Sequence, residues 1–163
     1  MLKDIRAALS VSFVITKNRR KSMLKGIPTV INPDLLKILM EMGHGDTLVI
    51  GDGNFPAAAN AKRLIRCDGQ TVPEMLNAIL KLFPLDTPDM KPACVMQTAP
   101  KMDRPPVWSE FEQIIADYEE GGRELTEIER FKFYEEAKKA YAIVSTGETA
   151  LYANIIIKKG VVI

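Results

Sequence analysis

Short apolar runs alternate with amphipathic segments along most of the chain, and this alternation constrains the fold more than any other feature. A short apolar run bounded by turn residues is typical of a buried strand, whereas apolar residues spaced three and four apart indicate a helix. The predicted strands are residues 47–50, 64–69, 93–97, 142–145 and 151–157, with residues 161–163 as a candidate for the last one. Alternating helices and strands predict a single-domain, three-layer α/β fold with a mostly parallel central sheet.

The predicted helices lie between these strands and are marked by capping residues. Asn32 followed by Pro33 predicts a helix start, and Gly43 predicts its end as a residue in the left-handed conformation. Further starts are indicated by a proline or by Ser/Thr and Glu at capping-box spacing: Pro73, Ser109 with Glu112, and Thr126 with Glu129. The last of these helices would carry Phe131 and Ala137 on its apolar face.

Composition and charge exclude several classes of function. The chain has 163 residues, of which 47% are apolar and 26% charged, and its net charge is +1. These values fit one domain with an ordinary core and indicate neither a nucleic-acid partner nor a membrane surface. No apolar run reaches the roughly 18 residues of a membrane span. Two isolated cysteines, Cys67 and Cys94, and a single histidine predict no disulfide framework and no metal site, and they favour a reducing, cytoplasmic location.

Residues 1–22 differ from the rest of the chain. Their apolar stretch, 7–15, is followed by the basic cluster 17–21, whereas a signal peptide has its basic residues ahead of the apolar core. The sequence Met-Leu-Lys at residues 23–25 repeats residues 1–3 and resembles a second start. We therefore expect residues 1–22 to be an N-terminal extension, either from an upstream start or added to the chain, and residues 23–163 to form the domain.

The single histidine and an aspartate both lie between glycines, on either side of one predicted strand. His44 precedes strand 47–50 and Asp52 follows it. An imidazole suits proton transfer near neutral pH. A carboxylate beyond the carboxyl end of a strand lies where open α/β sheets bind ligands. Two structural alternatives stay open, because His44 could hydrogen-bond the last carbonyls of the preceding helix and Asp52 could cap the next one.

Polar residues in the apolar run 151–157 indicate the kind of ligand. Tyr152 and Asn154 would share one face of a strand, and a buried Asn needs hydrogen-bond partners. Tyr134 offers a second phenol. A set of His, Asp, Asn and Tyr side chains without metal ligands favours a carbohydrate site. The Gly51-x-Gly53 sequence lacks the third glycine of a dinucleotide motif and the Lys-Ser/Thr of a P-loop, so neither nucleotide class is expected.

Six segments within residues 23–163 carry a resemblance to a known family. They are residues 24–28, 42–46, 52–57, 82–87, 128–140 and 146–160. On these segments the chain resembles the fucose mutarotase / ribose pyranase family. The last two segments are long and specific, and they favour the fucose branch over the ribose branch. Cys67 and Gln97 are small departures from the fucose pattern.

This resemblance implies the α/β fold of that family and an isomerase activity that interconverts the α and β anomers of L-fucose by acid/base-assisted ring opening and closure. It implies no cofactor and no metal ion. His44 would be the proton donor, with Tyr134 or Tyr152 as its catalytic partner. The implied substrate-binding residues are Asp52, Asp86, Met96, Arg130, Tyr134, Tyr152 and Asn154. The resemblance also implies a ring-shaped homo-oligomer, often a decamer, in which a neighbouring subunit completes each site.

Two alternative functions remain open. Within the family, the same site could interconvert the pyranose and furanose forms of D-ribose, and comparing the two sugars would decide. Outside it, the protein could be a non-catalytic oligomer that binds a monosaccharide. Binding without anomer exchange would identify that case.

Overall fold

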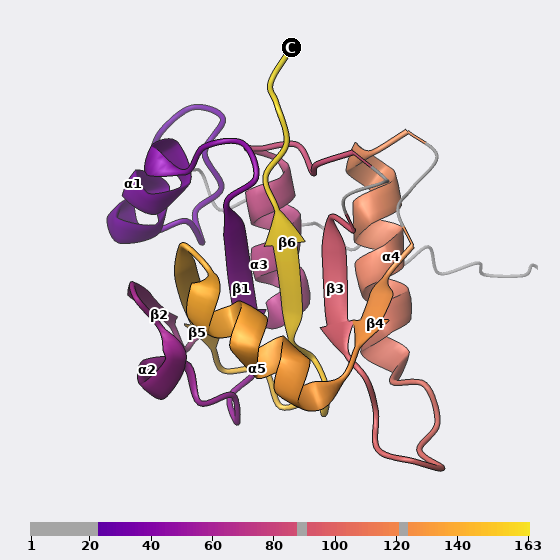
Figure 1. Ribbon diagram of the computed structural model, residues 1–163. Coiled ribbons are helices and arrows are strands. Elements are labelled where there is room, and N and C mark those ends of the chain that lie inside the picture. Colours follow the sequence, from indigo (N-terminus) through magenta and orange to yellow (C-terminus); the bar gives the residue numbers. More distant parts are fainter. Residues whose placement is uncertain (1–22, 88–90, 121–123) are drawn as a thin grey trace, which may run out of the picture.

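Six strands form one sheet at the centre of the molecule (Figure 1). The computed structural model describes residues 23–87, 91–120 and 124–163, so the predicted extension 1–22 lies outside the described residues. The strands are β1 (Thr47–Gly51), β2 (Leu64–Cys67), β3 (Ala93–Met96), β4 (Thr126–Ile128), β5 (Ala142–Thr146) and β6 (Ile155–Lys158). Their order across the sheet is β2-β5-β1-β6-β3-β4.

The strand directions confirm the predicted, mostly parallel sheet. β1 pairs in parallel with β5, β5 with β2, and β3 with β4. Among the described strands only β6 runs against its neighbours, β1 and β3. The carboxyl ends of the other strands therefore lie at one end of the sheet, which is the end where β6 begins. The segment that leads into β6 is thus brought to the edge at which α/β proteins commonly bind ligands.

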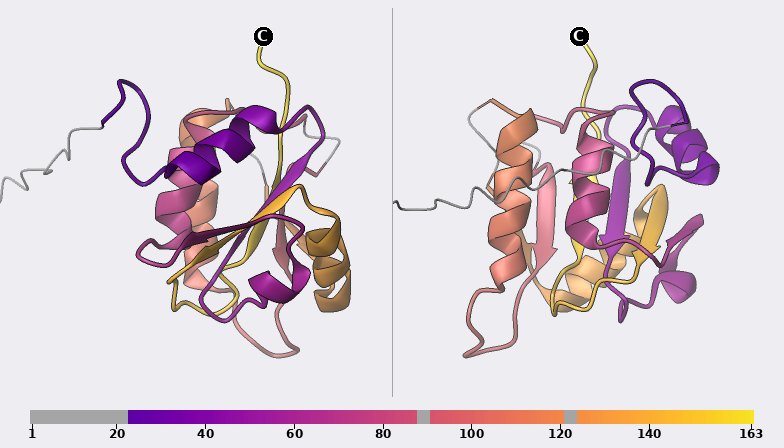
Figure 2. Two further views of the ribbon diagram at one scale, coloured as in Figure 1. Left: turned by 90° about the vertical axis from the view of Figure 1, so that its left-hand side faces the viewer. Right: turned by 180° about the vertical axis from the view of Figure 1, so that it is seen from behind.

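Helices cover both faces of the sheet, which confirms the three predicted layers (Figures 1 and 2). The helices are α1 (Pro33–Glu41), α2 (Ala57–Asn60), α3 (Val72–Leu80), α4 (Pro106–Tyr118) and α5 (Arg130–Lys139). α5 and the short α2 lie on the front face in Figure 1, and α3 and α4 lie behind the sheet. α1 lies on the side of α3 and α4, toward one edge, as the edge-on view shows (Figure 2).

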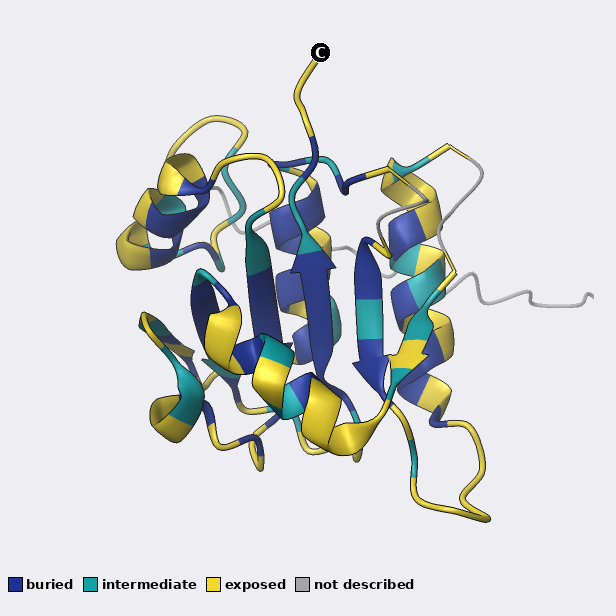
Figure 3. Ribbon diagram, viewed as in Figure 1, coloured by how far each residue is buried: buried dark blue, intermediate teal, exposed yellow. Residues whose placement is uncertain are grey.

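Two apolar clusters, one on each face, hold the layers together. The larger joins the sheet to α1, α3 and α4 and includes the fully buried Leu35, Trp108 and Phe111. The smaller lies under α5 and includes Phe133 and Ala137. The central strands β1 and β6 are buried on both faces, while the outer surface of α5 is exposed (Figure 3). Burial on both faces explains why these strands are continuous apolar runs rather than alternations of apolar and polar residues.

The first helix begins as predicted but ends differently. The Asn32 side-chain oxygen accepts a hydrogen bond of 2.8 Å from the Leu35 amide, and Pro33 occupies the first turn of α1. The predicted left-handed end at Gly43 is wrong, because α1 ends at Glu41 and its C-cap residue, Met42, is extended. The left-handed glycine is Gly45, with φ +85°. His44 and Gly45 therefore lie at the centre of a turn, in which the Asp46 amide donates to the Gly43 carbonyl.

Both predicted capping boxes are wrong, because the residues serve other elements. Ser109 and Glu112 lie inside α4, which begins at Pro106, and both accept hydrogen bonds from Arg104. Thr126 belongs to β4, whose pairing with β3 overrides the local capping signal. Glu129 itself caps α5 by accepting from the amides of the second and third following residues. The buried face of α5 consists of Phe133 and Ala137, whereas Phe131, which was also predicted to lie on it, is 73% exposed.

The prediction for the last strands is also partly wrong. β6 begins only at Ile155, because Tyr152 adopts a left-handed conformation with φ +57° that no strand residue has. Tyr152 and Asn154 therefore do not share a strand face. Residues 161–163 do not extend the sheet but leave the body of the molecule with exposed side chains (Figure 1).

Candidate functional site

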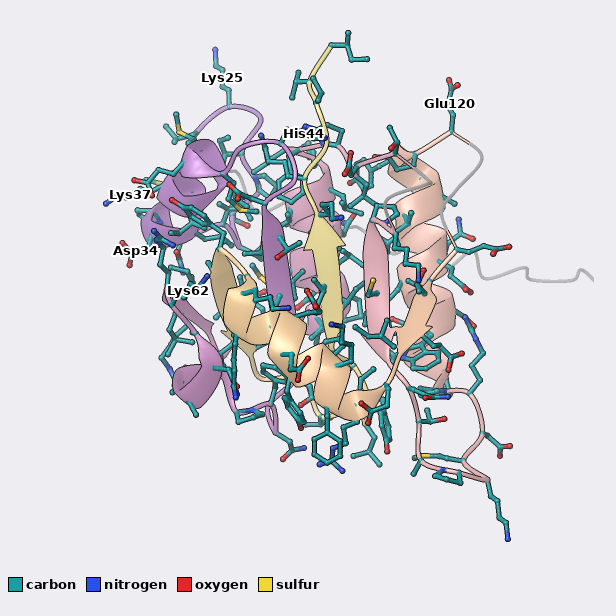
Figure 4. All side chains as sticks on the ribbon, in the orientation of Figure 1. Lys25, Asp34, Lys37, His44, Lys62 and Glu120 are labelled. Carbon is teal, nitrogen blue, oxygen red and sulfur yellow. The ribbon has the colours of Figure 1, made fainter. Side chains whose placement is uncertain are left out.

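The predicted site residues divide between two cavities at opposite ends of β1. His44 precedes the strand and Asp52 directly follows it. At about 3.3 Å per residue, a five-residue strand separates the two ends by roughly 16 Å. Figure 4 shows His44 at the end of the sheet from which the C-terminal segment leaves. One copy of the chain therefore does not bring His44 against Asp52.

The first cavity, here called the Asp52 cavity, has a volume of about 380 Å³. It lies at the edge where the parallel strands end and β6 begins. It brings together six of the predicted substrate-binding residues. Its lining consists of Asp52, Asn54, Phe55, Met96, Met102, Arg130, Tyr134, Leu151, Tyr152 and Asn154.

Asp52 and Asn154 form a reciprocal pair at the base of this cavity. The Asp52 amide donates to Asn154 Oδ1 over 2.8 Å, and Asn154 Nδ2 donates to Asp52 Oδ2 over 2.9 Å. Both residues are buried. Burial raises the pKa of Asp52, while hydrogen bonds from the Asn54 amide and the Asn154 side chain partly oppose that rise. Asp52 does not cap α2, whose N-cap position is Pro56, so that alternative is wrong.

Aromatic rings form one wall of the Asp52 cavity. Tyr134 stacks on Phe55 with centroids 5.8 Å apart, and the Arg130 guanidinium lies 5.9 Å from the centre of the Tyr134 ring. A Cβ at Gly51 would come within 3.0 Å of the Phe55 ring, so this glycine allows Phe55 its place. The Tyr152 hydroxyl accepts a hydrogen bond of 3.2 Å from the Ala99 amide, which leaves its own proton free to donate. Polar groups beside aromatic faces suit a ligand with hydroxyls and C–H surfaces.

The second cavity, here called the His44 cavity, has a volume of about 720 Å³. His44 Nε2 lies 3.0 Å from Asp86 Oδ1, so the ring is oriented by a carboxylate and not by the carbonyls of α1. Asp86 Oδ2 is buried and has no hydrogen-bond partner among the described residues. The lining consists of His44, Pro84, Leu85, Asp86, Thr87, Glu119, Gly160, Val161, Val162 and Ile163.

The pKa of Asp86 lies below its usual value. Burial acts to raise it, but the Thr87 amide, the His44 side chain and the charge of Lys158 together outweigh burial. The Asp86 carboxylate therefore stays ionised at neutral pH, with Oδ1 against the imidazole and Oδ2 buried.

Asp86 is held in place by the end of β6. The Asp86 amide donates to the Lys158 carbonyl over 2.9 Å, and the Gly160 amide donates to the Pro84 carbonyl over 2.9 Å. The Leu85 amide points away from β6, and Glu119 Oε1 accepts its hydrogen bond over 2.8 Å. A Cβ at Gly160 would collide with the Leu85 carbonyl, so only glycine fits there.

Sequence reasoning missed several residues of both cavities. Asn54 and Phe55 could have been found, because they directly follow Asp52 in the turn after β1. Met102, Leu151 and Glu119 carry no local signal, since loops and a helix end bring them to the cavities through tertiary contacts.

Within the described residues, no group of three or more His, Cys, Asp or Glu side chains could hold a metal ion. Over the same residues, no helix has the length and apolar character needed to cross a membrane.

The fold and the two cavities define a small α/β protein with a buried acid–amide pair, an aromatic wall and a separate histidine–carboxylate pair. The chain belongs to the RbsD / FucU transport protein family, whose sequence model matches residues 25–162. This confirms the family expected from the sequence.

Three similar proteins are named fucose mutarotase. The chain is 50% identical over 147 residues to a fucose mutarotase of Danio rerio, covering 86% of this chain and 95% of the relative. It is 48% identical over 141 residues to an L-fucose mutarotase of Histophilus somni, covering 85% and 97%. The crystal structure of a fucose mutarotase in complex with L-fucose from Streptococcus pneumoniae matches with a TM-score of 0.81 and 51% identity, covering 86% of this chain and all of that one.

Proposed function

We propose that this protein is an isomerase that interconverts the α and β anomers of L-fucose. The observation that carries the proposal is the Asp52 cavity, in which a buried Asp52–Asn154 pair, Arg130 and two tyrosines surround a space suited to one sugar. Support comes from the relatives that are about half identical over most of their length and are named fucose mutarotase. One solved relative is described in complex with L-fucose.

In this proposal the Asp52 cavity binds the sugar. Asp52 accepts hydrogen bonds from sugar hydroxyls, while Arg130 and Asn154 hydrogen-bond neighbouring oxygens. Tyr134 offers its ring face to the C–H surface of the sugar, and Met96 contributes an apolar contact. Hydrogen bonds and apolar contacts of this kind suit an uncharged ligand rich in hydroxyls and need no cofactor or metal ion.

The chemistry consists of two proton transfers. The ring oxygen gains a proton and the anomeric hydroxyl loses one, so the ring opens to the aldehyde. Rotation about C1–C2 and reclosure give the other anomer. His44 donates the proton and a phenol, Tyr134 or Tyr152, guides the other one. Because a phenol is a weak base near neutral pH, the tyrosine relays the proton directly or through water. Positioned acid–base groups contribute about 10²- to 10⁴-fold each.

The two-cavity arrangement calls for a second copy of the chain. His44 lies roughly 16 Å from the Asp52 cavity along β1, which is too far for proton transfer within one chain. We therefore assign His44 and Asp86 of one copy to the sugar bound in the Asp52 cavity of its neighbour. Asp86 orients the His44 ring, and its carboxylate, as part of the lining of the His44 cavity, accepts a sugar hydroxyl.

Such a contact joins two different surfaces, and repeated copies form a ring when the rotation from one copy to the next closes. Exposed apolar residues flank both cavities and would be covered in it. Phe131 and Leu151 are 73% and 60% exposed, the first beside Arg130 and the second lining the Asp52 cavity. Val161, Val162 and Ile163 line the His44 cavity. The proposed assembly is a ring-shaped homo-oligomer, with a decamer as the expected size.

The proposed domain is residues 23–163, with residues 1–22 as an extension outside it. The family's sequence model begins at residue 25, which supports this division. A cytoplasmic location is proposed on the basis of two cysteines that form no disulfide with one another, Cys67 and Cys94.

Magnetisation-transfer NMR on the anomeric protons of L-fucose at equilibrium tests the proposal. The wild-type protein should accelerate exchange above the buffer rate, and His44→Ala should lose most of that acceleration. Asp68→Asn changes an exposed carboxylate that lines neither cavity, so it serves as the control and should exchange fucose normally.

Two other results would change the assigned function. Exchange of ribose pyranose and furanose signals with fucose left at the buffer rate would make the protein a ribose pyranase. Binding of fucose without acceleration for either sugar would leave a monosaccharide-binding oligomer.

A further inference from the structure

Tyr152 has a backbone conformation that needs outside support. Its φ of +57° lies in the left-handed region, which is unfavourable for a residue with a large side chain. The other described non-glycine residues with positive φ, Lys91 and Lys101, are exposed, whereas Tyr152 is partly buried. A strained conformation persists only where the surrounding structure fixes it, and such residues cluster at functional sites.

The support comes from the helix layer behind the sheet. Trp108 Nε1 donates a hydrogen bond of 2.9 Å to the Tyr152 carbonyl. Trp108 lies on α4, is only 1% exposed and belongs to the larger apolar cluster. Tyr152 packs against both apolar clusters, so its backbone meets the rear layer while its phenol lines the Asp52 cavity at the front.

Trp108 is itself held in place. The Arg104 guanidinium lies 5.5 Å from the centre of the indole ring and also binds Ser109 and Glu112 on the same helix. Displacement of the Tyr152 carbonyl would move the phenol and also Asn154, two residues further along. Asn154 holds Asp52, so the Tyr152 phenol and the Asp52–Asn154 pair both follow the position of this one carbonyl.

We propose that Trp108 is a positioning residue of the sugar site, whose indole N–H holds the Tyr152 carbonyl and so fixes the left-handed turn that directs the Tyr152 phenol into the Asp52 cavity. Trp108 does not touch the sugar. It acts through Tyr152, whose hydroxyl is held at its other end by the Ala99 amide. The inference rests on the proposed mutarotase function only for its kinetic readout.

The indole N–H of Trp108 can be removed on its own to test this role. The chain has one tryptophan, so biosynthetic replacement of tryptophan changes Trp108 alone. β-(3-Benzothienyl)alanine has a sulfur where indole has its N–H, and it therefore removes the donor at nearly constant shape. 5-Fluorotryptophan keeps the N–H and is the matched control. Phe111→Leu, a substitution in the same buried face of α4, controls for general loss of core packing.

The kinetic expectation is specific to the donor. The benzothienyl protein should lose about tenfold or more of kcat/KM for fucose anomer exchange, since misplaced catalytic groups carry losses of that order. The fluorotryptophan protein and Phe111→Leu should stay within about twofold of wild type, although Phe111→Leu melts at a lower temperature. Benzothienyl protein with wild-type kinetics, or an equal loss in Phe111→Leu, would overturn the inference.

A second readout does not depend on catalysis. The Ala99 amide proton donates to the Tyr152 hydroxyl, so its NMR shift reports the position of the phenol. In the benzothienyl protein this signal should move toward its position in Tyr152→Phe, and in the fluorotryptophan protein it should not. If wild type fails to exchange fucose but the Ala99 signal still follows the Trp108 donor, the proposed function is wrong and the positioning role stands. An unmoved signal refutes the positioning role.

Discussion

His44 and Asp86 pair across 3.0 Å with opposite exposure, since the imidazole side chain is 56% exposed and the carboxylate only 3%. The buried member fixes the orientation and the exposed member is free to meet a ligand. This arrangement gives the one histidine of the chain a defined direction, which a solvated surface histidine would lack.

Asp86→Asn tests whether the charge of that carboxylate matters. The substitution keeps the shape and one acceptor oxygen but removes the charge that pairs with a protonated imidazole. We expect fucose exchange to slow by about tenfold to hundredfold, with sugar affinity at the Asp52 cavity little changed. Magnetisation-transfer NMR over a range of fucose concentrations separates the two quantities. An unchanged rate would leave Asp86 with a structural role only.

Mixing inactive variants tests the shared site. His44→Ala lacks the donor but keeps the Asp52 cavity, whereas Tyr134→Phe with Asp52→Ala damages the cavity but keeps His44. In a mixed ring, a site is complete only where a copy with the damaged cavity supplies its intact His44 to the intact cavity of a His44→Ala neighbour. Random assembly of equal amounts makes about one contact in four productive, so about a quarter of wild-type activity should return. The two variants are mixed, denatured and refolded together, and the rate of fucose anomer exchange in the refolded mixture measures the returned activity. If each chain held a complete site of its own, no activity would return.

Sequence patterns correctly predicted the features that depend on residues close together in the chain. Asp52 was placed correctly beyond the carboxyl end of a strand, because an acid that directly follows a strand has that position in any α/β sheet. The start of α1 was predicted because Asn32 and Pro33 act on their own helix. The layer order and the mostly parallel sheet followed from alternation of helices and strands.

Features decided by distant contacts could not be predicted. The His44–Asp86 pair depends on the bridge between Leu85 and Lys159, which brings together segments far apart in the chain. The pairing of β4 with β3 removed Thr126 from the helix that its capping signal indicated. Tyr152 and Asn154 do share a cavity, but through a left-handed turn held by Trp108 and not through strand alternation.

The two buried aspartates should titrate in opposite directions from the ordinary value of about 3.9. Burial raises the pKa of Asp52, and hydrogen bonds offset it only in part. Burial also acts on Asp86, but the Thr87 amide and His44 outweigh it and lower its pKa. Carboxyl ¹³C NMR, assigned with Asp52→Asn and Asp86→Asn, should therefore show Asp52 protonating first as the pH falls. The reverse order would contradict the assigned environments.

The sign of the stability effect follows from these directions. A carboxyl with a lowered native pKa contributes stability above its unfolded-chain pKa, and the contribution is lost as the pH falls through the native value. Asp86→Asn should therefore lower the free energy of unfolding at neutral pH, and the difference from wild type should shrink in acid. For Asp52 the sign is opposite, because its ionisation disfavours the native state as the pH rises. Urea unfolding at fixed protein concentration across pH measures both.

Gly160→Ala should separate the placement of Asp86 from its chemistry. The added Cβ would collide with the Leu85 carbonyl and come within 3.1 Å of the Asp86 Cα. We expect a loss of about 1–3 kcal/mol in the free energy of unfolding, as for other overpacked sites, and slower fucose exchange because the Asp86 carboxylate shifts away from His44. Gly69→Ala is the matched control, since nothing lies within 4 Å of a Cβ there. Thermal melting and anomer exchange measured on both variants check the prediction. If Gly160→Ala behaves like Gly69→Ala, the backbone around Leu85 yields easily and does not fix the position of the carboxylate.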